Sequence, residues 1–490
     1  MCYPSKSTYL KDAESFNRIP VFREIYADFE TPVSIFVRTG GRFLLESVDR
    51  GENVGRFSII GLGVKTVISV LGSELEIVEY TDDGGSARTA SREDDPLGAI
   101  KTYFDGLRVP DYEGLPPFSG GAIGYLGYEA VQYFEDIPVR QNTGGIPDGM
   151  LVVPETLLVY DTVKRSVVVV VSSDPGTDPN TAYDRALKKI DTIAAGLKKP
   201  FQFDNRQFER GFDIGIESNM TKRDFLEKVK KCRELIHDGE AIHVVLSQKF
   251  SLRTQAEPFE LYRSLRVTNP SPYMFYLDFD RFTIIGSSPE VMVRLRNGEM
   301  LVKPIAGTRS RGSSVAEDTT IAKNLLTDEK ERAEHLMLVD LGRNDLGKVA
   351  RAGSVEVEDY MSIEKYSHVM HIVSTIKAEL DEGKDTFDVI GATFPAGALT
   401  GAPKVRAMEI ISEMESERRG PYGGMIFNLD YNGNLDSCII IRSIVFENGN
   451  MSLHTGASVV ADSESDAEYE KSINMARATI EAVRNRVGSR

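Results

Sequence analysis

Two glutamates, Glu331 and Glu334, are three positions apart in a charged segment that precedes an apolar stripe. The segment 328–340 begins with polar residues and continues with leucine and valine at helical spacing, so we expect a helix there. The two carboxylates then lie one turn apart on the same face. Paired in this way they could hold a hard divalent cation such as Mg²⁺. The commoner alternative is a solvated acidic helix start that complements the helix dipole.

Other segments place reactive or charged groups beside small residues. Glu290 follows Gly286 and two serines at the end of a predicted strand, where a ligand could approach the backbone closely. The stretch 303–309 is a tight, donor-rich turn. His368 and His371 are three apart but lack a third histidine or cysteine nearby, which favours a buried, hydrogen-bonded histidine over a zinc site.

The last third of the chain contains small-residue loops beside cationic side chains. The loop 394–402 leads into a helix whose first turn contains Lys404, and helix N-termini attract carboxylates. The glycine-rich turn 420–424 precedes a strand. Arg442 follows the turn at 432–433, and we expect it in the next strand.

Composition limits the class of protein. The chain has 490 residues, and 58 basic against 74 acidic side chains give a net charge of −16, which argues against nucleic acid or a membrane surface as partner. Cys2, Cys232 and Cys438 are odd in number and far apart, so neither a disulfide framework nor zinc spacing is indicated. The first 20 residues lack the apolar stretch of a signal peptide, and no run of about 18 apolar residues occurs. We therefore expect a cytoplasmic location.

The pattern of elements predicts an α+β fold rather than repeated βαβ units. Strands are expected at 56–62, 65–71 and 74–80, and the segment 32–46 is predicted to be a hairpin turning at Gly40 and Gly41. The polar stretch 81–96 is predicted to be a surface loop.

Helices are predicted at 181–198 and from Thr221 to Gly239. The polar stretch 199–220 separates them, so we divide the chain into an N-terminal lobe, 1–200, and a second region, 201–490.

Seven motifs occur in a fixed order, and together they are far more specific than any one alone. They are GSSPE, PIAGTR, KERAEHLMLVDLGRNDLG, HVMHIVS, FPAGALTGAPKVRAMEI, RGPYGG and IRSI. With them the chain resembles the chorismate-utilising enzymes, and among these the large subunits of anthranilate synthases. The match covers about 221–480, with a recognisable N-terminal lobe before it. It implies a sandwich of two large, roughly orthogonal antiparallel sheets with helices around them.

The resemblance also implies a reaction and its residues. Ammonia adds at C2 of chorismate, the C4 hydroxyl leaves and pyruvate is eliminated, with Mg²⁺ neutralising the ring carboxylate. Glu290 matches the acid that protonates the leaving hydroxyl, and His371 matches a residue of the elimination step; His243 is the third catalytic candidate. The implied metal residues are Glu334, Glu331 and Glu468. The implied substrate residues are Tyr422, Arg442, Gly456, Ala457, Ser458, Ala398, Thr400 and Lys404.

The same resemblance implies feedback inhibition by tryptophan and a partner. The matching inhibitor pocket comprises Ser47, Pro270, Ser271, Tyr273 and Met274. The chain has no candidate glutaminase triad, so ammonia should come from a glutamine amidotransferase subunit or from solution.

Four positions depart from the family pattern. Gln, Thr, Gly and Glu are usual where this chain has His243, Ala398, Ser458 and Lys471. An ammonium at 471 in place of a metal-ligating carboxylate would repel Mg²⁺. Either the site is retuned, or the chain is a divergent paralogue that acts as a binding or regulatory subunit.

A second alternative is an aminodeoxychorismate synthase subunit. Those relatives usually have lysine where this chain has Ala306, and relatives that add water to C2 have lysine in place of His243. Both positions favour formation of anthranilate.

Overall fold

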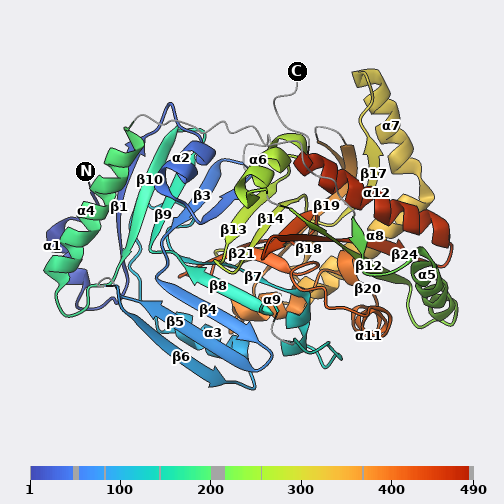
Figure 1. Cartoon of the computed structure of the whole chain (residues 1–490), viewed down its shortest axis with the longest axis horizontal. Helices are drawn as coiled ribbons and strands as arrows, with labels where there is room; N and C mark the ends of the chain where they lie inside the picture. Colours follow the sequence, from blue (N-terminus) through green and yellow to red (C-terminus); the bar gives the residue numbers. More distant parts are fainter. Residues whose placement is uncertain are drawn as a thin grey trace.

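The computed structural model describes residues 2–47, 55–81, 84–142, 145–199, 216–254, 256–366 and 369–484. Within these residues two 12-stranded antiparallel sheets are surrounded by helices, which confirms the predicted α+β sandwich (Figure 1).

The first sheet contains, in spatial order, β1 (Ile19–Tyr26), β10 (Ser166–Ser173), β9 (Thr156–Asp161), β3 (Phe57–Leu62), β2 (Phe43–Glu46), β13 (Tyr273–Asp278), β14 (Phe282–Ser288), β23 (Ser443–Glu447), β24 (Asn450–Val459), β12 (His243–Arg253) and β11 (Glu217–Ser218), with β20 (Gly401–Ala402) paired to β12. The second contains β17 (Ile305–Ser310), β19 (Val369–Glu379), β16 (Glu299–Val302), β15 (Val291–Arg296), β22 (Leu435–Ile439), β21 (Met425–Asp430), β7 (Gly121–Leu126), β8 (Gly149–Val153), β4 (Thr66–Leu71), β5 (Glu74–Tyr80) and β6 (Ser86–Arg92), with β18 (Glu356–Lys365) paired to β19.

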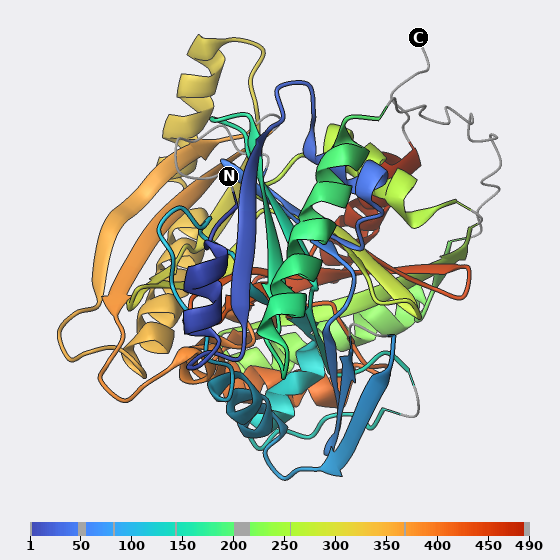
Figure 2. The same ribbon diagram turned by 90° about the vertical axis from the view of Figure 1, so that its left-hand side faces the viewer.

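The helices are α1 (Lys6–Asp12), α2 (Pro32–Thr39), α3 (Pro96–Asp105), the 3₁₀ helix η1 (Tyr128–Tyr133), α4 (Pro179–Leu197), α5 (Lys222–His237), α6 (Pro258–Thr268), α7 (Val315–Thr327), α8 (Glu329–Gly347), α9 (Thr386–Thr393), α10 (Gly397–Thr400), α11 (Lys404–Met414) and α12 (Ser465–Arg484). Helix α4 packs along β1 and β10, on the side of the molecule that faces the viewer in Figure 2.

Both sheets take strands from both halves of the chain. In the first sheet, β2 from the N-terminal half pairs with β13 from the C-terminal half; in the second, β7 pairs with β21. The boundary predicted at 200/201 lies in the segment 200–215, outside the described residues. The halves therefore share their sheets.

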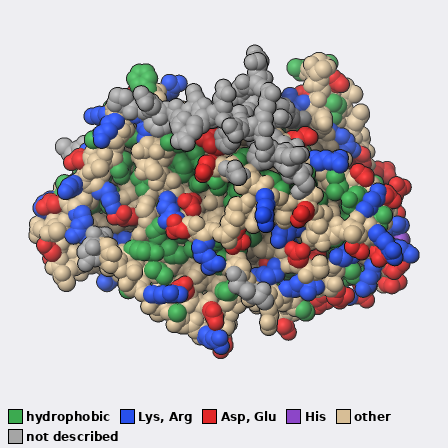
Figure 3. Space-filling view, in the orientation of Figure 1, with side chains coloured by type: hydrophobic (Ala, Val, Ile, Leu, Met, Phe, Trp, Pro, Cys, Tyr) green, Lys and Arg blue, Asp and Glu red, His purple; other side chains and the backbone are tan. Residues whose placement is uncertain are grey.

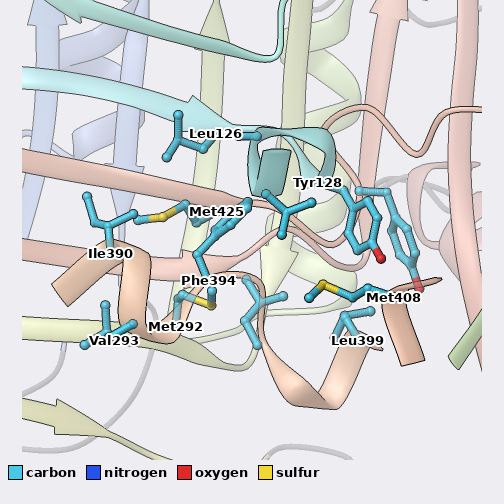
Figure 4. Packing of buried hydrophobic residues seen from close by; sticks show 14 of the residues in the cluster. Leu126, Tyr128, Met292, Val293, Ile390, Phe394, Leu399, Met408 and Met425 are labelled. Carbon is cyan, nitrogen blue, oxygen red and sulfur yellow. The ribbon is translucent and has the colours of Figure 1, made fainter. Parts of the chain in front are cut away.

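Three large hydrophobic clusters stabilise this arrangement. One lies between the sheets and joins Phe43 and Phe275 of the first to Tyr125 and Ile426 of the second. Another lies beneath α4, α6 and α12 on the first sheet. The third, drawn in Figure 4, packs Phe394 and other residues of the helical segments against Met292 and Met425 of the second sheet.

The predicted hairpin at 32–46 is wrong in its first arm, which is helix α2. Thr31 and Ser34 form a reciprocal capping box, and Pro32 lies in the first turn. Gly40 ends the helix with φ of 67°, a left-handed conformation that glycine adopts at no steric cost. Local capping therefore outweighs the β-branched composition.

The segments between 56 and 96 form the predicted strands and one further strand that was not predicted. The strands expected at 56–62, 65–71 and 74–80 correspond to β3, β4 and β5. The predicted loop 81–96 contains the exposed edge strand β6, which backbone pairing with β5 holds without an apolar face. The glycines at 120–127 serve close packing: a Cβ at Gly124 would lie 2.3 Å from the Met150 carbonyl oxygen.

The surface shows no segregation of charge on the face drawn in Figure 3, where basic and acidic side chains are intermixed.

Among the described helices, none is both long and apolar enough to span a membrane.

Candidate active site

Glu290 and Arg442 lie where two neighbouring chain segments pass from one sheet to the other. One segment leaves β14 of the first sheet and enters β15 of the second at Glu290. The other leaves β22 of the second sheet and enters β23 of the first just after Arg442. Because β14 pairs with β23 and β15 with β22, the two crossings are adjacent. Arg442 therefore lies at the bend before the strand, not in it as predicted.

The environment of Glu290 keeps its carboxyl group protonated near neutral pH. Burial raises the pKa of Glu290 to about 8, although the positive charge of Arg442 acts in the opposite direction. Burial also lowers the pKa of Arg442. A carboxylate ligand bound to Arg442 would neutralise that opposing charge and so raise the pKa of Glu290 further.

His371, on β19, is held in one orientation by the bulge in the neighbouring strand. Its Nδ1 lies 3.3 Å from the Gly307 carbonyl oxygen and 3.0 Å from Thr308 Oγ1. Since a carbonyl oxygen only accepts, Nδ1 carries the proton of the neutral ring and Nε2 keeps a lone pair. Burial, followed by the charge of Arg442, lowers the pKa of His371, so the ring is neutral at pH 7.

The bulge at Gly307 also connects His371 to the predicted metal residues. The register of β17 against β19 shifts between Ala306 and Thr308, and Gly307 has φ of 61°. The next residue after Thr308 is Arg309, whose Nη1 donates to Glu331 Oε1 at 2.8 Å. The sequence predicts this turn but not the contacts of Thr308 and Arg309, because both residues have partners far along the chain.

The predicted metal residues do come together, at the start of α8 and of α12. Burial, then the charge of Glu331, raises the pKa of Glu334, and Glu468 acts in the same direction. Lys471 Nζ lies 3.8 Å from Glu468 Oε2. The group is thus three carboxylates with Arg309 hydrogen-bonded to Glu331 and the half-exposed Lys471 beside Glu468; the charge of Lys330 also acts on Glu334.

As arranged, these donors do not fit Mg²⁺. Among the described residues, no three His, Cys, Asp or Glu side chains are grouped so as to hold a metal ion. Arg309 occupies one oxygen of Glu331, and the ammonium of Lys471 lies beside Glu468. A divalent cation would have to displace or tolerate both positive charges.

His243 begins β12 and is buried with 2% of its surface exposed. Neither ring nitrogen has a hydrogen-bond partner among the described residues. Burial, followed by the charge of Lys471, lowers the pKa of His243 to about 4. The ring is therefore neutral at pH 7 and lies within electrostatic reach of Lys471.

Tyr422 lies beside the predicted substrate residues of β24. Gly456, Ala457 and Ser458 pair with β12, and a Cβ at Gly456 would lie 2.7 Å from the Tyr422 hydroxyl oxygen. The Tyr422 ring stacks on His454 with centroids 5.2 Å apart. Glycine at 456 thus makes room for the phenol.

The predicted substrate residues of the 394–404 loop divide into two groups. Ala398 lines a cavity of about 60 Å³ together with Glu290. Thr400 is fully buried and donates to the Ala396 carbonyl oxygen at 3.1 Å. The ammonium of Lys404 donates to Asp345 Oδ2 at 2.6 Å. Lys404 therefore forms an ion pair with Asp345 and is not free to bind an anionic ligand.

A buried ion pair that the motifs did not reveal supports this region. Arg419 donates to both oxygens of Glu415, at 2.8 and 2.6 Å, and to the carbonyl oxygens of Leu399 and Val245. It thereby ties α10, α11 and β12 together.

The predicted inhibitor residues adjoin a separate cavity of about 470 Å³ between the sheets. Ser47, Tyr273 and Met274 line this cavity, as do Arg294 and Asp436. The buried Ser47 hydroxyl has no hydrogen-bond partner in the part of the chain that the structure describes. Pro270 and Ser271 are not part of the lining, and Ser271 instead accepts from Ser287 Oγ at 2.8 Å.

Comparisons with known proteins show which family the chain belongs to. Residues 60–480 match the family model described as chorismate binding enzyme. Anthranilate synthase component 1 of Acetivibrio thermocellus is 43% identical over 492 residues, covering 99% of both chains. Its counterpart from Aquifex aeolicus is 43% identical over 480 residues, covering 96% of both.

A solved structure supports the same assignment. The crystal structure of anthranilate synthase component I from Streptococcus pneumoniae TIGR4 has 34% identity and a TM-score of 0.75, covering 93% of this chain and 98% of that one. The chain therefore belongs to the family of chorismate-binding enzymes that includes these anthranilate synthase components.

Proposed function

We propose that the chain is the large subunit of an anthranilate synthase, a lyase that converts chorismate and ammonia to anthranilate and pyruvate in tryptophan biosynthesis. The observation that supports this most directly is the carboxyl group of Glu290, which burial keeps protonated beside the guanidinium of Arg442. This pairs a proton donor with an anchor for a carboxylate, as the reaction requires.

In the first half-reaction, ammonia forms a bond to C2 of chorismate and the C4 hydroxyl leaves. Arg442 and Tyr422 bind the enolpyruvyl carboxylate. Glu290 donates its proton to the departing hydroxyl, which leaves as water. His243, neutral at pH 7, can accept a hydrogen bond from the incoming amine without competing for its proton.

In the second half-reaction, the amino intermediate loses the proton on C2 and the bond from C3 to the enolpyruvyl oxygen breaks. His371 Nε2 is the base, because Gly307 and Thr308 hold Nδ1. The ring becomes aromatic, and the released enolpyruvate takes up a proton to become pyruvate.

Ammonia would come from a separate glutamine amidotransferase subunit. Burial raises the pKa of the Cys232 thiol to about 12 and also raises that of the Cys438 thiol, so neither can serve as a glutaminase nucleophile. Cys2 Sγ accepts from Arg23 at 2.9 Å. The three thiols are unpaired, which is compatible with a cytoplasmic location.

Tryptophan is the proposed inhibitor for the cavity between the sheets. Arg294 and Asp436 offer one charge for each end of an amino-acid zwitterion, and Ser47 adds a hydroxyl that has no hydrogen-bond partner among the described residues. Titration calorimetry with tryptophan, repeated on Ser47→Leu to fill the cavity wall, tests this proposal.

A fluorescence assay tests the main function. Purified chain, chorismate, ammonium and Mg²⁺ at alkaline pH should give anthranilate fluorescence and an equal amount of pyruvate. A product with nitrogen at C4 would instead support the aminodeoxychorismate alternative. Binding of chorismate without any pyruvate release would support a binding or regulatory subunit.

A further inference from the structure

The acidic cluster formed by Glu331, Glu334 and Glu468 contains its own cations. Arg309 binds Glu331 Oε1 at 2.8 Å and Asp328 Oδ2 at 3.0 Å. Lys471 lies three residues after Glu468 on α12, with Nζ 3.8 Å from its Oε2. Glu331 therefore has a hydrogen-bonded cation, whereas the buried Oε2 of Glu468 has Lys471 nearby but no hydrogen-bond partner among the described residues.

Lys471 also acts on groups from two other elements. Its charge opposes the rise in the pKa of Glu334 on α8 and lowers the pKa of His243 on β12. Its side chain is 53% exposed while that of Glu468 is 13% exposed, so the ammonium is accessible and the carboxylate is largely covered. The ammonium is therefore open to solvent beside the acidic cluster.

We propose that Lys471 replaces the divalent cation of this site, so that the chain binds chorismate without Mg²⁺. A dicarboxylate approaching three glutamates needs a positive charge to offset their repulsion. The ammonium provides that charge and three hydrogen-bond donors for a carboxylate. This inference rests on the proposed function, since chorismate is the anion considered.

His243 supports the same arrangement independently of the carboxylates. Its buried imidazole has two nitrogens without partners among the described residues, although burying an unpaired polar group is costly. A ligand at Lys471 would give this ring a partner. The charge of Lys471 also lowers the pKa of this ring, so the departures from the family pattern at 243 and 471 lie within electrostatic reach of each other.

The first experiment measures the metal site directly, with Mn²⁺ as the probe and no chorismate. Electron paramagnetic resonance should detect no Mn²⁺ bound at the acidic cluster of the wild-type chain. Lys471→Glu should gain one Mn²⁺, and the double variant with Glu334→Gln should lose it again. A wild-type chain that binds one Mn²⁺ in a manner abolished by Glu334→Gln would overturn the proposal.

The second experiment measures chorismate binding by calorimetry without ammonia, in excess EDTA or in Mg²⁺. The wild-type Kd should agree within about twofold between the two conditions. Lys471→Gln should weaken binding in EDTA by roughly tenfold or more, as expected for loss of a charge-assisted contact. Arg477→Gln, which removes a positive charge from an exposed position of the same helix, is the matched control and should leave Kd unchanged.

The outcomes separate this inference from the function on which it rests. Wild-type binding that requires Mg²⁺ overturns the role of Lys471 and leaves the proposed function intact. No chorismate binding in either condition overturns both. Lys471→Glu that binds chorismate only with Mg²⁺ supports the exchange of one cation for the other.

Discussion

Replacing Glu290 with glutamine should stabilise the folded chain while it removes the proposed proton donor. The amide is neutral at every pH and has nearly the shape of the protonated acid, so Glu290→Gln relieves the cost of burying a charge. The pKa of Glu290 is about 8 in the folded chain against an ordinary value of 4.5. The favourable contribution of the protonated acid is therefore complete below pH 4.5 and is lost as the pH rises to 8.

The size of the effect follows from those two pKa values. At about 1.4 kcal/mol per pH unit, wild type should lose roughly 3 kcal/mol relative to Glu290→Gln by pH 7 and about 5 kcal/mol above pH 8. Unfolding entropy of about 2 cal/mol/K per residue gives about 1 kcal/mol/K for a chain of this length. The variant should therefore melt about 3 °C above wild type at pH 7 and at the same temperature near pH 4.5.

Differential scanning fluorimetry of both proteins from pH 4.5 to 9 measures this difference. Turnover provides the second readout, because removing the acid should lower kcat by roughly 10² to 10⁴-fold while chorismate still binds. A Tm difference that does not change with pH would refute the buried, protonated state of Glu290. Unchanged turnover would refute its role as the acid.

Three further predictions concern buried ionisable groups. Arg419→Met leaves Glu415 buried without its partner, so the free energy of unfolding should fall by about 3–5 kcal/mol. Because about 1 kcal/mol shifts the melting temperature of this chain by about 1 °C, a melting temperature within 1 °C of wild type would contradict this prediction. The pKa of His243 is lowered to about 4, so the stability that its neutral form contributes is complete above pH 6.5 and is lost as the pH falls to 4. In urea titrations, the free energy of unfolding of wild type should therefore fall by about 2 kcal/mol between pH 7 and 5 relative to that of His243→Gln. Lys404→Met should destabilise by about 3–5 kcal/mol, and adding Asp345→Leu should restore most of that loss if the ion pair is structural; failure of the double variant to recover would favour an anion-binding Lys404.

The sequence could predict elements whose signals are local. Helix α5 begins after Thr221, as expected, and β3, β4 and β5 form where strands were predicted. Helix α2 was missed because its β-prone composition conflicts with a capping signal that only the structure resolves. Local patterns therefore succeed where composition and capping agree.

The site was only partly predictable, because its decisive contacts join distant residues. The motif containing Glu290 identified a carboxylate, but its burial depends on pairing of β14 and β15 with strands about 150 positions later. Likewise, the turn containing Arg309 looked donor-rich, yet its partner Glu331 is on a helix that follows another helix. Lys404 looked available for an anion until the structure paired it with Asp345.

The backbone at Arg442 gives an independent argument for the role of its side chain. Its φ of 49° lies in the left-handed region, which costs a non-glycine residue about 1–2 kcal/mol. The bend is required where the chain leaves β22 for β23, and its carbonyl oxygen accepts from the Ser287 amide at 3.2 Å. Glycine would make the same bend and the same backbone hydrogen bond at lower cost. The strain is therefore explained by what arginine adds, which is a guanidinium beside the protonated Glu290 and the neutral His371.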